Sequence, residues 1–226
     1  MRGAFERLHT VDVRGGEPLR VGKIVCVGKN YRDHLAEMGY ASDEDPVLFL
    51  KPATALLHSG SVFTLPAFSR DVQHEVELVI AIGKTGRDIP EDLALGHVFG
   101  YAVGLDLTCR DLQKKAKERG EPWAVAKGFD GSAPISAVVP AGDAGDPGDL
   151  AIHLSVNGAV RQSARTSQMI HGAAWLVAYA SRYMTLERGD LLMTGTPSGV
   201  ASLAPGDHVR GEIERVGTVE IRVQGA

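Results

Sequence analysis

Two glutamates separated by one residue, Glu75 and Glu77, stand at the start of a strongly apolar stretch that runs to Ile82. Because side chains on a β-strand alternate between its two faces, both carboxylates are expected to project from the same side. Carboxylates held this close repel each other, and a hard divalent cation with oxygen ligands removes the conflict. The spacing therefore indicates a Mg²⁺ or Mn²⁺ site. The alternative is the solvated face of an edge strand, where this short pattern has no function.

A third acid, Asp106, lies within the apolar segment 101–109. A buried carboxylate without a partner is costly, so Asp106 requires a cation, an arginine or backbone donors. A metal ion shared with Glu75 and Glu77 would satisfy all three carboxylates. We therefore predict that these three acids converge on one ion.

A histidine and an acid three residues apart, His34 and Glu37, occur in the segment 31–38, which is expected to form a short helix capped by Asn30. On a helix this spacing places both side chains on one face. A carboxylate beside imidazole selects its tautomer and raises its basicity, which suits a general base acting near neutral pH. The alternative is an exposed ion pair, which is common and weak.

The segment Gly-Thr-Pro-Ser-Gly at 195–199 follows an apolar strand. Its backbone N–H groups and the Thr196 hydroxyl can together hold a carboxylate. The alternative is an ordinary turn. No lysine follows the second glycine, so the segment is not a phosphate-binding loop, and nucleotide binding is not expected.

The elements that must position these residues are mainly strands, and we expect an α+β fold that is mostly β. Proline, glycine and apolar alternation predict strands at 23–28, 47–52, 61–66, 74–83 and 101–109. Helices are expected at 110–119 and from Ser167 through Tyr183. Asn157-Gly158 predicts a tight hairpin, and residues 207–213 and 216–223 a second one. Residues 1–20 form an arm or short hairpin, and residues 21–226 a single catalytic domain.

Composition narrows the class of partner. The 226 residues carry a formal charge of −4, with no basic footprint for nucleic acid or an anionic membrane. No apolar run approaches the length of a membrane span, and the N-terminus lacks the apolar core of a signal peptide. Cys26 and Cys109 lie in apolar segments, which favours buried thiols over a disulfide. We expect a soluble cytoplasmic protein that binds a small molecule.

Six motifs occur in an order that resembles one known family. They are Val-Gly-Lys-Asn-Tyr-Arg-Asp-His at 27–34, Phe-Leu-Lys-Pro at 49–52, His-Glu-Val-Glu at 74–77, Gly-Leu-Asp-Leu-Thr at 104–108, Ala-Lys-Gly-Phe-Asp at 126–130 and Leu-Met-Thr-Gly-Thr-Pro-Ser-Gly-Val at 192–200. From about Val21 to the C-terminus the chain resembles the fumarylacetoacetate hydrolase family. It is most similar to the short single-domain acylpyruvate hydrolases, which act on fumarylpyruvate or acetylpyruvate.

The resemblance implies a mixed β-sandwich or roll with peripheral helices, usually assembled as a homodimer. It makes Glu75, Glu77 and Asp106 ligands of Mg²⁺ or Mn²⁺. It makes His34 and Glu37 a water-activating dyad on a lid-like helix, and Lys127 a catalytic residue that reaches the metal-bound substrate. The implied substrate-binding residues are Asn30, Tyr31, Lys51, Arg110, Gln113 and Thr196.

The same resemblance implies an activity. The dyad favours metal-dependent hydrolysis of an acylpyruvate-type 2,4-dioxo acid, a reaction of aromatic catabolism that cleaves a C–C bond to release pyruvate and a carboxylic acid. An enolate bound to a metal ion is also an intermediate of other reactions, and the fold does not select among them. The alternatives are therefore oxaloacetate decarboxylation or tautomerisation, and hydration or isomerisation of 2-hydroxydienoates. From a different class, the chain could be a non-catalytic metal-binding β domain.

Overall fold

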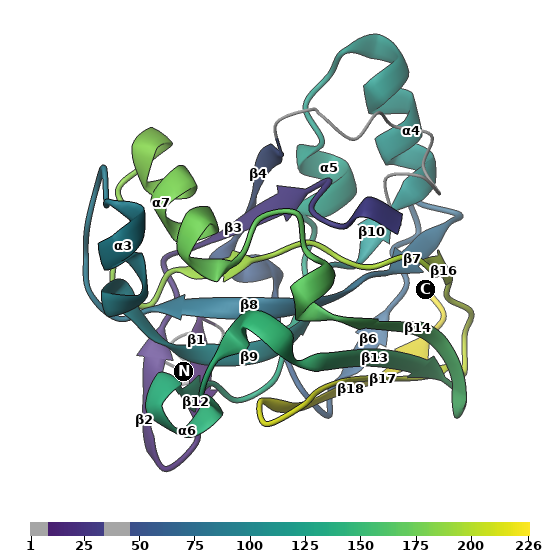
Figure 1. Cartoon of the computed structure of the whole chain (residues 1–226). Coiled ribbons are helices and arrows are strands. Elements are labelled where there is room, and N and C mark those ends of the chain that lie inside the picture. The colour runs from purple at the N-terminus through teal and green to yellow at the C-terminus, as the bar shows by residue number, and fades with distance from the viewer. Residues whose placement is uncertain (1–8, 34–45) are drawn as a thin grey trace, which may run out of the picture.

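The computed structural model describes residues 9–33 and 46–226, which fold mainly into β-strands (Figure 1). The largest sheet is mixed, with both parallel and antiparallel pairs. Its strands, in spatial order, are β4 (Val47–Pro52), β3 (Lys23–Gly28), β15 (Leu191–Met193), β8 (Val76–Ile82), β9 (Val98–Leu105), β11 (Ala133–Ile135) and β5 (Leu56–His58), with β12 (Val139–Pro140) paired to β9.

A second sheet packs against the first, below β8 and β9 in Figure 1. Its strands, in order, are β14 (Ala159–Arg165), β13 (Ala151–Val156), β17 (His208–Ile213), β18 (Gly217–Gln224) and β6 (Val62–Thr64). The hairpin predicted at Asn157-Gly158 is confirmed, and both turn residues have positive φ, at 53° and 80°. The predicted hairpin near the C-terminus is confirmed as β17 and β18.

The apolar stretch after Glu77 is explained by the burial of β8 on both faces. Leu78, Ile80 and Ile82 belong to the larger core, which lies between the two sheets and under helix α7 (Ala173–Tyr183). Val79 and Ala81 belong to a second core on the other face. Because both faces of this central strand are buried, its residues after Glu77 are apolar throughout and do not alternate with polar ones.

The predicted strands at 74–83 and 101–109 are each interrupted, which corrects the expectation of continuous strands. Glu75 separates β7 (Val72–His74) from β8, and Asp106 with Leu107 separates β9 from β10 (Thr108–Cys109). β7 and β10 leave the large sheet and pair with each other in a three-stranded sheet whose third strand is β16 (Ala201–Ser202). Both acids therefore stand where the chain passes from one sheet to another.

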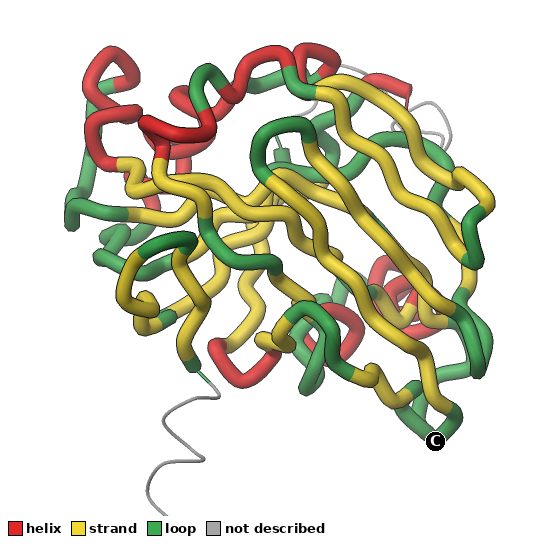
Figure 2. Tube along the Cα trace, turned by 90° about the horizontal axis from the view of Figure 1, so that it is seen from below, coloured by secondary structure: helices red, strands yellow, loops and turns green. Residues whose placement is uncertain are grey.

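The helices lie at the periphery, as the tube in Figure 2 shows in red. The predicted helix 110–119 is confirmed as α4 (Arg110–Arg119), which ends at Gly120 with φ 66°. The prediction of one helix from Ser167 to Tyr183 is wrong at its start, because α7 begins only at Ala173. Residues 169 and 170 instead bond to the segment after β3. The other helices are α3 (Glu91–Ala94), α5 (Ala124–Lys127), α6 (Ala141–Ala144), η1 (Ala53–Ala55), η2 (Leu95–His97), η3 (Pro147–Asp149) and η4 (Thr166–Gln168).

Near the N-terminus, β1 (Thr10–Val13) and β2 (Gly16–Arg20) form a hairpin that contributes Val11 and Leu19 to the second core. Of the helix expected at 31–38, Arg32 and Asp33 are helical, and the remainder lies outside the described residues. The predicted fold class, mostly β with peripheral helices, is confirmed.

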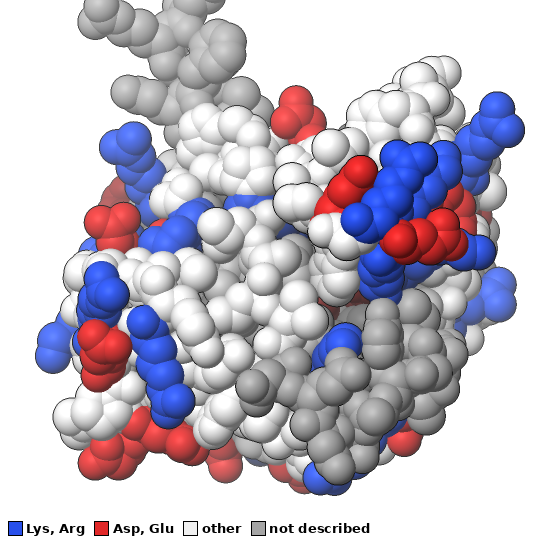
Figure 3. All heavy atoms as spheres, turned by 90° about the horizontal axis from the view of Figure 1, so that it is seen from above, with Lys and Arg blue, Asp and Glu red and all other residues white. Residues whose placement is uncertain are grey.

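Acidic and basic side chains are intermingled on the face shown in Figure 3. The described residues form no large area of a single charge in this view. Within the described part of the chain, no helix is long and apolar enough to cross a membrane. Cys26 and Cys109 are both buried and unbridged, as predicted.

Candidate metal and substrate site

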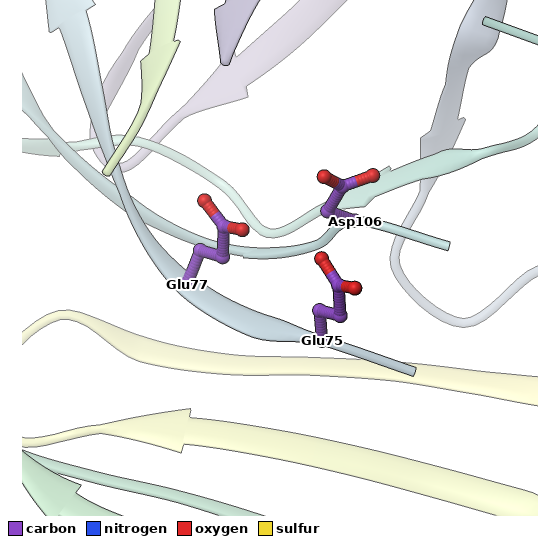
Figure 4. Close-up of side chains that lie close together, drawn as sticks. All are labelled: Glu75, Glu77 and Asp106. Atoms are coloured by element: carbon purple, nitrogen blue, oxygen red, sulfur yellow. The ribbon is translucent and has the colours of Figure 1, made fainter. Parts of the chain in front are cut away.

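Three carboxylates converge where the sheets meet. Oxygen atoms of Glu75, Glu77 and Asp106 lie within 4.8 Å of one another, and the three residues are 5%, 2% and 0% exposed. Figure 4 shows the three carboxyl groups directed toward a common space. The predicted convergence is therefore present in the structure. The alternative of a solvated edge strand is wrong, because β8 is a central, buried strand.

The backbone around the break holds these acids in register. Glu77 lies opposite Gly104 in the β8–β9 ladder, and the Asp106 N–H donates to the Glu75 carbonyl oxygen at 2.8 Å. Gly104 is required here, because a Cβ at this position would lie 2.6 Å from a methyl carbon of Val79. The acids are thus carried by paired strands and their immediate continuations, which limits their relative movement.

Lys127, at the end of α5, reaches into the cluster of acids. Its ammonium donates to Glu75 Oε2 at 2.9 Å, to Asp106 Oδ2 at 2.6 Å and to Thr108 Oγ1 at 2.6 Å. Burial by itself lowers the pKa of Lys127, but the charges of Asp106 and Glu75 outweigh it and raise the pKa to about 12. Lys127 is therefore a fixed positive charge between two of the acids.

A second lysine, Lys51 on β4, is also fully buried. Its Nζ lies 2.9 Å from Asp106 Oδ1 and donates to the carbonyl oxygens of Leu107, at 3.2 Å, and Lys127. The sequence predicted Lys51 at the edge of the substrate pocket. In the structure it lies behind the acids instead, where it compensates the charge of Asp106.

Arg110 and Gln113, in the first turn of α4, flank Glu75. The Arg110 guanidinium pairs with Glu75 Oε1 and donates to Gln113 Oε1 at 2.6 Å. With its carbonyl oxygen engaged in this way, Gln113 can present its amide nitrogen to a ligand. The two residues lie side by side at the site, as their sequence spacing predicts.

Of the three clustered acids, Glu77 is the one that forms no salt bridge with a residue in 9–33 or 46–226. One of its oxygens accepts a hydrogen bond from the Gly195 N–H at 2.7 Å. Burial raises the pKa of Glu77 well above its ordinary value, and the charges of Asp106 and Glu75 raise it further. The cluster therefore retains an uncompensated acidic side, which faces the space between the three carboxylates.

The residues present fit a divalent metal ion. Asp106 Oδ1 is buried and accepts no hydrogen bond within the described chain, although the Lys51 ammonium is near. This oxygen and the Glu77 carboxylate, whose one hydrogen bond given above comes from the Gly195 N–H, are oxygen ligands of the kind that Mg²⁺ and Mn²⁺ take. Glu75, Glu77 and Asp106 would hold the ion, as the sequence predicted.

A cavity opens onto the acids. Phe49 and Trp123 form an apolar part of its wall, with ring centroids 5.8 Å apart. Lys29 and Lys117 supply cationic side chains. The remaining lining residues are Val27, Gly28, Glu75, Glu77, Asp106, Arg110, Gln113, Lys127 and Thr196.

Two residues predicted at the pocket edge do not line this cavity. The Asn30 amide is buried and donates to the carbonyl oxygens of Thr194 and His171, while its oxygen accepts from the His171 N–H. Asn30 thus ties the end of β3 to the segment before α7. Tyr31 is buried and lines a neighbouring cavity together with Pro197. The predicted dyad, His34 and Glu37, lies outside the described residues.

Sequence reasoning missed two polar residues at the edge of this site. His74 is buried and pairs through Nδ1 with the side chain of Gln162 on β14. Nothing in the sequence around Gln162 distinguishes it from an exposed hairpin residue. One feature of the sequence could have indicated that Lys51 compensates a buried charge, namely that this lysine lies within the apolar strand 47–52.

Residues 23–224 match the family model described as fumarylacetoacetate (FAA) hydrolase C-terminal. The chain belongs to this family of enzymes, whose members include hydrolases and tautomerases or isomerases. The resemblance predicted from the ordered motifs is confirmed.

Particular relatives carry different activities. The chain is 45% identical over 201 residues to the mitochondrial oxaloacetate tautomerase FAHD1 of Mus musculus, covering 89% of this chain and 91% of that protein. It is 47% identical over 190 residues to the oxaloacetate tautomerase YcgM of Escherichia coli K12, covering 84% and 87%. The crystal structure of fumarylpyruvate hydrolase from Pseudomonas aeruginosa, in complex with Mn²⁺ and pyruvate, is 41% identical over 96% of both chains, with a TM-score of 0.93.

Proposed function

We propose that this protein is a Mg²⁺- or Mn²⁺-dependent enzyme that interconverts the enol and keto forms of oxaloacetate. The proposal rests on one structural observation, the convergence of Glu75, Glu77 and Asp106 beside Lys127 in one cavity. The substrate is chosen because the mouse and E. coli relatives, at 45% and 47% identity, are both oxaloacetate tautomerases.

Glu75, Glu77 and Asp106 would hold the metal, which when bound supplies a Lewis acid for the carboxylate and keto oxygens of a 2-oxo acid. Residues of the chain itself would position the metal ligands and the substrate. Lys127 and Arg110 hold the Glu75 carboxylate in place at the cavity wall, since both donate to its oxygens. Gln113 adds an amide donor at the cavity wall. Donors fixed before the substrate arrives cost no reorganisation when charge develops on it.

Tautomerisation moves one proton and leaves the carbon skeleton intact. The enol loses its O2 proton, the C2–C3 double bond becomes single, and C3 takes up a proton. His34, oriented by Glu37, is the proposed group that carries the proton, and this assignment rests on their spacing in the sequence. The alternative that the chain is a non-catalytic module is disfavoured by its family of enzymes.

The second candidate is acylpyruvate hydrolysis, favoured by the similarity to the P. aeruginosa hydrolase. In that reaction His34 would take a proton from water. The water oxygen would then bond to the distal carbonyl carbon, C4. The C3–C4 bond would break with its electron pair going to C3, and C3 would take up a proton to give pyruvate and a carboxylate. The apolar wall at Phe49 and Trp123 could accept a distal acyl group.

A paired assay separates these reactions. The decay of enol-oxaloacetate absorbance, corrected for the spontaneous rate, measures tautomerisation. Coupled pyruvate detection measures hydrolysis of acetylpyruvate and fumarylpyruvate, and decarboxylation of oxaloacetate. We expect the tautomerisation rate to dominate with Mn²⁺ and to fall to background with EDTA.

The matched variants are Glu75→Ala/Glu77→Ala, which removes two of the three metal ligands, and Glu118→Gln, which changes an exposed acid on α4. The double variant should be inactive and the Glu118→Gln variant should retain full activity. Faster release of pyruvate from an acylpyruvate than turnover of oxaloacetate would favour hydrolysis. No turnover of any substrate with metal would refute both candidates.

A further inference from the structure

Gln162 is the one buried residue of β14, a strand whose other residues are exposed or half-buried. The β13–β14 ladder shifts register here, since Leu154 pairs with Gln162 whereas Ser155 pairs with Val160. Arg161 is therefore an extra residue in a β-bulge. Bulges redirect the side chains next to them, and this one is associated with an inward-facing Gln162.

All hydrogen-bonding positions of the Gln162 amide are occupied. Its Oε1 accepts from the Val76 N–H and from His74 Nδ1, both at 3.1 Å. Its Nε2 donates to Thr196 Oγ1 and to the Pro197 carbonyl oxygen, both at 2.8 Å. A backbone N–H only donates and a carbonyl oxygen only accepts, so these two backbone partners determine which end of the amide is oxygen.

The orientation of the Gln162 amide determines which atom of His74 carries the proton and where the Thr196 hydroxyl directs its proton. Because Gln162 Oε1 can only accept, His74 carries its proton on Nδ1. Because Gln162 Nε2 donates to Thr196 Oγ1, the threonine hydroxyl must direct its own proton elsewhere, and it donates to the Val76 carbonyl oxygen at 2.8 Å. The single proton of this hydroxyl is thus committed to the Val76 carbonyl oxygen, so the backbone N–H groups of the 195–199 loop, and not the Thr196 hydroxyl, remain as the predicted donors to a substrate carboxylate.

The partners of Gln162 lie on both sides of the site. Residues 74 and 76 are the immediate neighbours of Glu75, so Gln162 Oε1 holds the chain on either side of that acid. Residues 196 and 197 belong to the loop that follows β15, and Thr196 lines the cavity. Gly199 lets the same loop lie against the bulge, because its φ is +96° and a Cβ there would lie 2.1 Å from the Arg161 carbonyl oxygen.

We propose that Gln162 is a positioning residue that sets the separation between the Glu75 metal ligand and the Thr196 loop, and thereby between the metal and the substrate carboxylate. The inference rests on the proposed function for the identity of that metal and substrate. Gln162 does not line the cavity, and it acts through the four groups that it binds.

The test compares Gln162→Met, which keeps the side-chain length but removes all four hydrogen bonds, with Ser181→Ala. Ser181 is an equally buried polar residue on α7 that accepts from the Ile89 N–H and donates to the Ala178 carbonyl oxygen, remote from the acids. Mn²⁺ affinity is measured by titration calorimetry or by electron paramagnetic resonance, without substrate. Thermal unfolding, KM and kcat are then measured for each protein.

Loss of a hydrogen-bond partner of a metal ligand commonly weakens metal binding about 10- to 100-fold. Because Gln162 bonds to the residues on either side of Glu75 and not to its carboxylate, we expect about the lower figure for Gln162→Met. KM should rise more than kcat falls at saturating Mn²⁺. Ser181→Ala should lower the unfolding temperature and leave Mn²⁺ affinity and KM unchanged. Wild-type Mn²⁺ affinity and KM in Gln162→Met would overturn the inference.

Gln162→Glu provides a second test in case Gln162→Met does not fold. It keeps an acceptor for Val76 and His74 and loses both donations to residues 196 and 197. We expect its Mn²⁺ affinity to stay close to the wild-type value, with KM raised. A wild-type KM would overturn the inference. A wild-type protein that bound no Mn²⁺ would refute the proposed function first, and this inference with it.

Discussion

The Asp106 N–H donates a 2.8 Å hydrogen bond to the carbonyl oxygen of Glu75, at the point where both segments leave the large sheet for the small one. On either side of this bond the two segments are paired, as β8 with β9 and as β7 with β10. Two of the three candidate metal ligands therefore sit on backbone positions bonded directly to each other. Such a site is largely assembled by folding, before any metal arrives.

Lys127 should be required for turnover. Lys127→Met removes the hydrogen bonds that orient Glu75 and Asp106, and loss of such a partner of a metal ligand typically lowers activity about 10- to 100-fold. The measurement is kcat at saturating Mn²⁺ and substrate. Lys115→Met, on the exposed face of α4, is the control and should retain activity. A near-wild-type kcat in Lys127→Met would show that Lys127 only compensates charge.

Lys51 should contribute mainly to stability. Lys51→Met leaves the buried Asp106 carboxylate with Lys127 as its remaining cation, and breaking a buried ion pair costs about 3–5 kcal/mol in free energy of unfolding. Urea denaturation with EDTA at pH 7 measures the loss. Arg165→Met breaks a solvent-exposed pair with Asp149 and should cost far less. Equal losses in the two variants would contradict the prediction.

Asp111 should make stability depend on pH. Partial burial raises the pKa of Asp111, but hydrogen bonds from Ser69 and from the N–H groups of Arg70 and Leu112 outweigh it and lower the pKa. A lowered pKa stabilises the fold above the unfolded value of about 3.9. This contribution is lost as the pH falls through the lower folded value.

Asp111→Asn should therefore cost about 1 kcal/mol at pH 7, in line with the loss of hydrogen bonds to a carboxylate. The difference from wild type should shrink progressively below about pH 4. Chemical denaturation at a series of pH values measures it. Asp143→Asn, at an exposed position in α6, should show neither effect. A difference that stayed constant down to pH 2 would argue against an ionised Asp111 in the fold.

Gly199 should be intolerant of a side chain. Its φ of +96° by itself costs a non-glycine residue about 1–3 kcal/mol, and the added Cβ would meet the Arg161 carbonyl oxygen at 2.1 Å. Gly199→Ala should lower the unfolding temperature and raise KM, because the loop would move away from β14. Gly142→Ala, in a helix with nothing within 4 Å, should be neutral or slightly stabilising. Similar unfolding temperatures for the two variants would refute this account.

Local sequence determined much of the molecule. Alternating and apolar runs located most strands, and Asn157-Gly158 located a hairpin because its two residues accept positive φ. The one-residue spacing of Glu75 and Glu77, with a lone acid at 106, predicted the converging carboxylates. The start of α7 was harder to predict than its end at Tyr183, because the apolar periodicity of 167–183 does not show that residues 169 and 170 bond to the segment after β3.

The tertiary structure decided which charges meet. Lys51 and Lys127 are 76 residues apart in sequence, yet both contact Asp106, because α5 packs against both β4 and β10 beside the break in the strands. Gln162 has no local signal at all, since its partners are at residues 74, 76, 196 and 197. Local propensity and side-chain periodicity act over a few residues. The compensation of buried charge and the satisfaction of buried amides depend on groups that only the folded chain brings together.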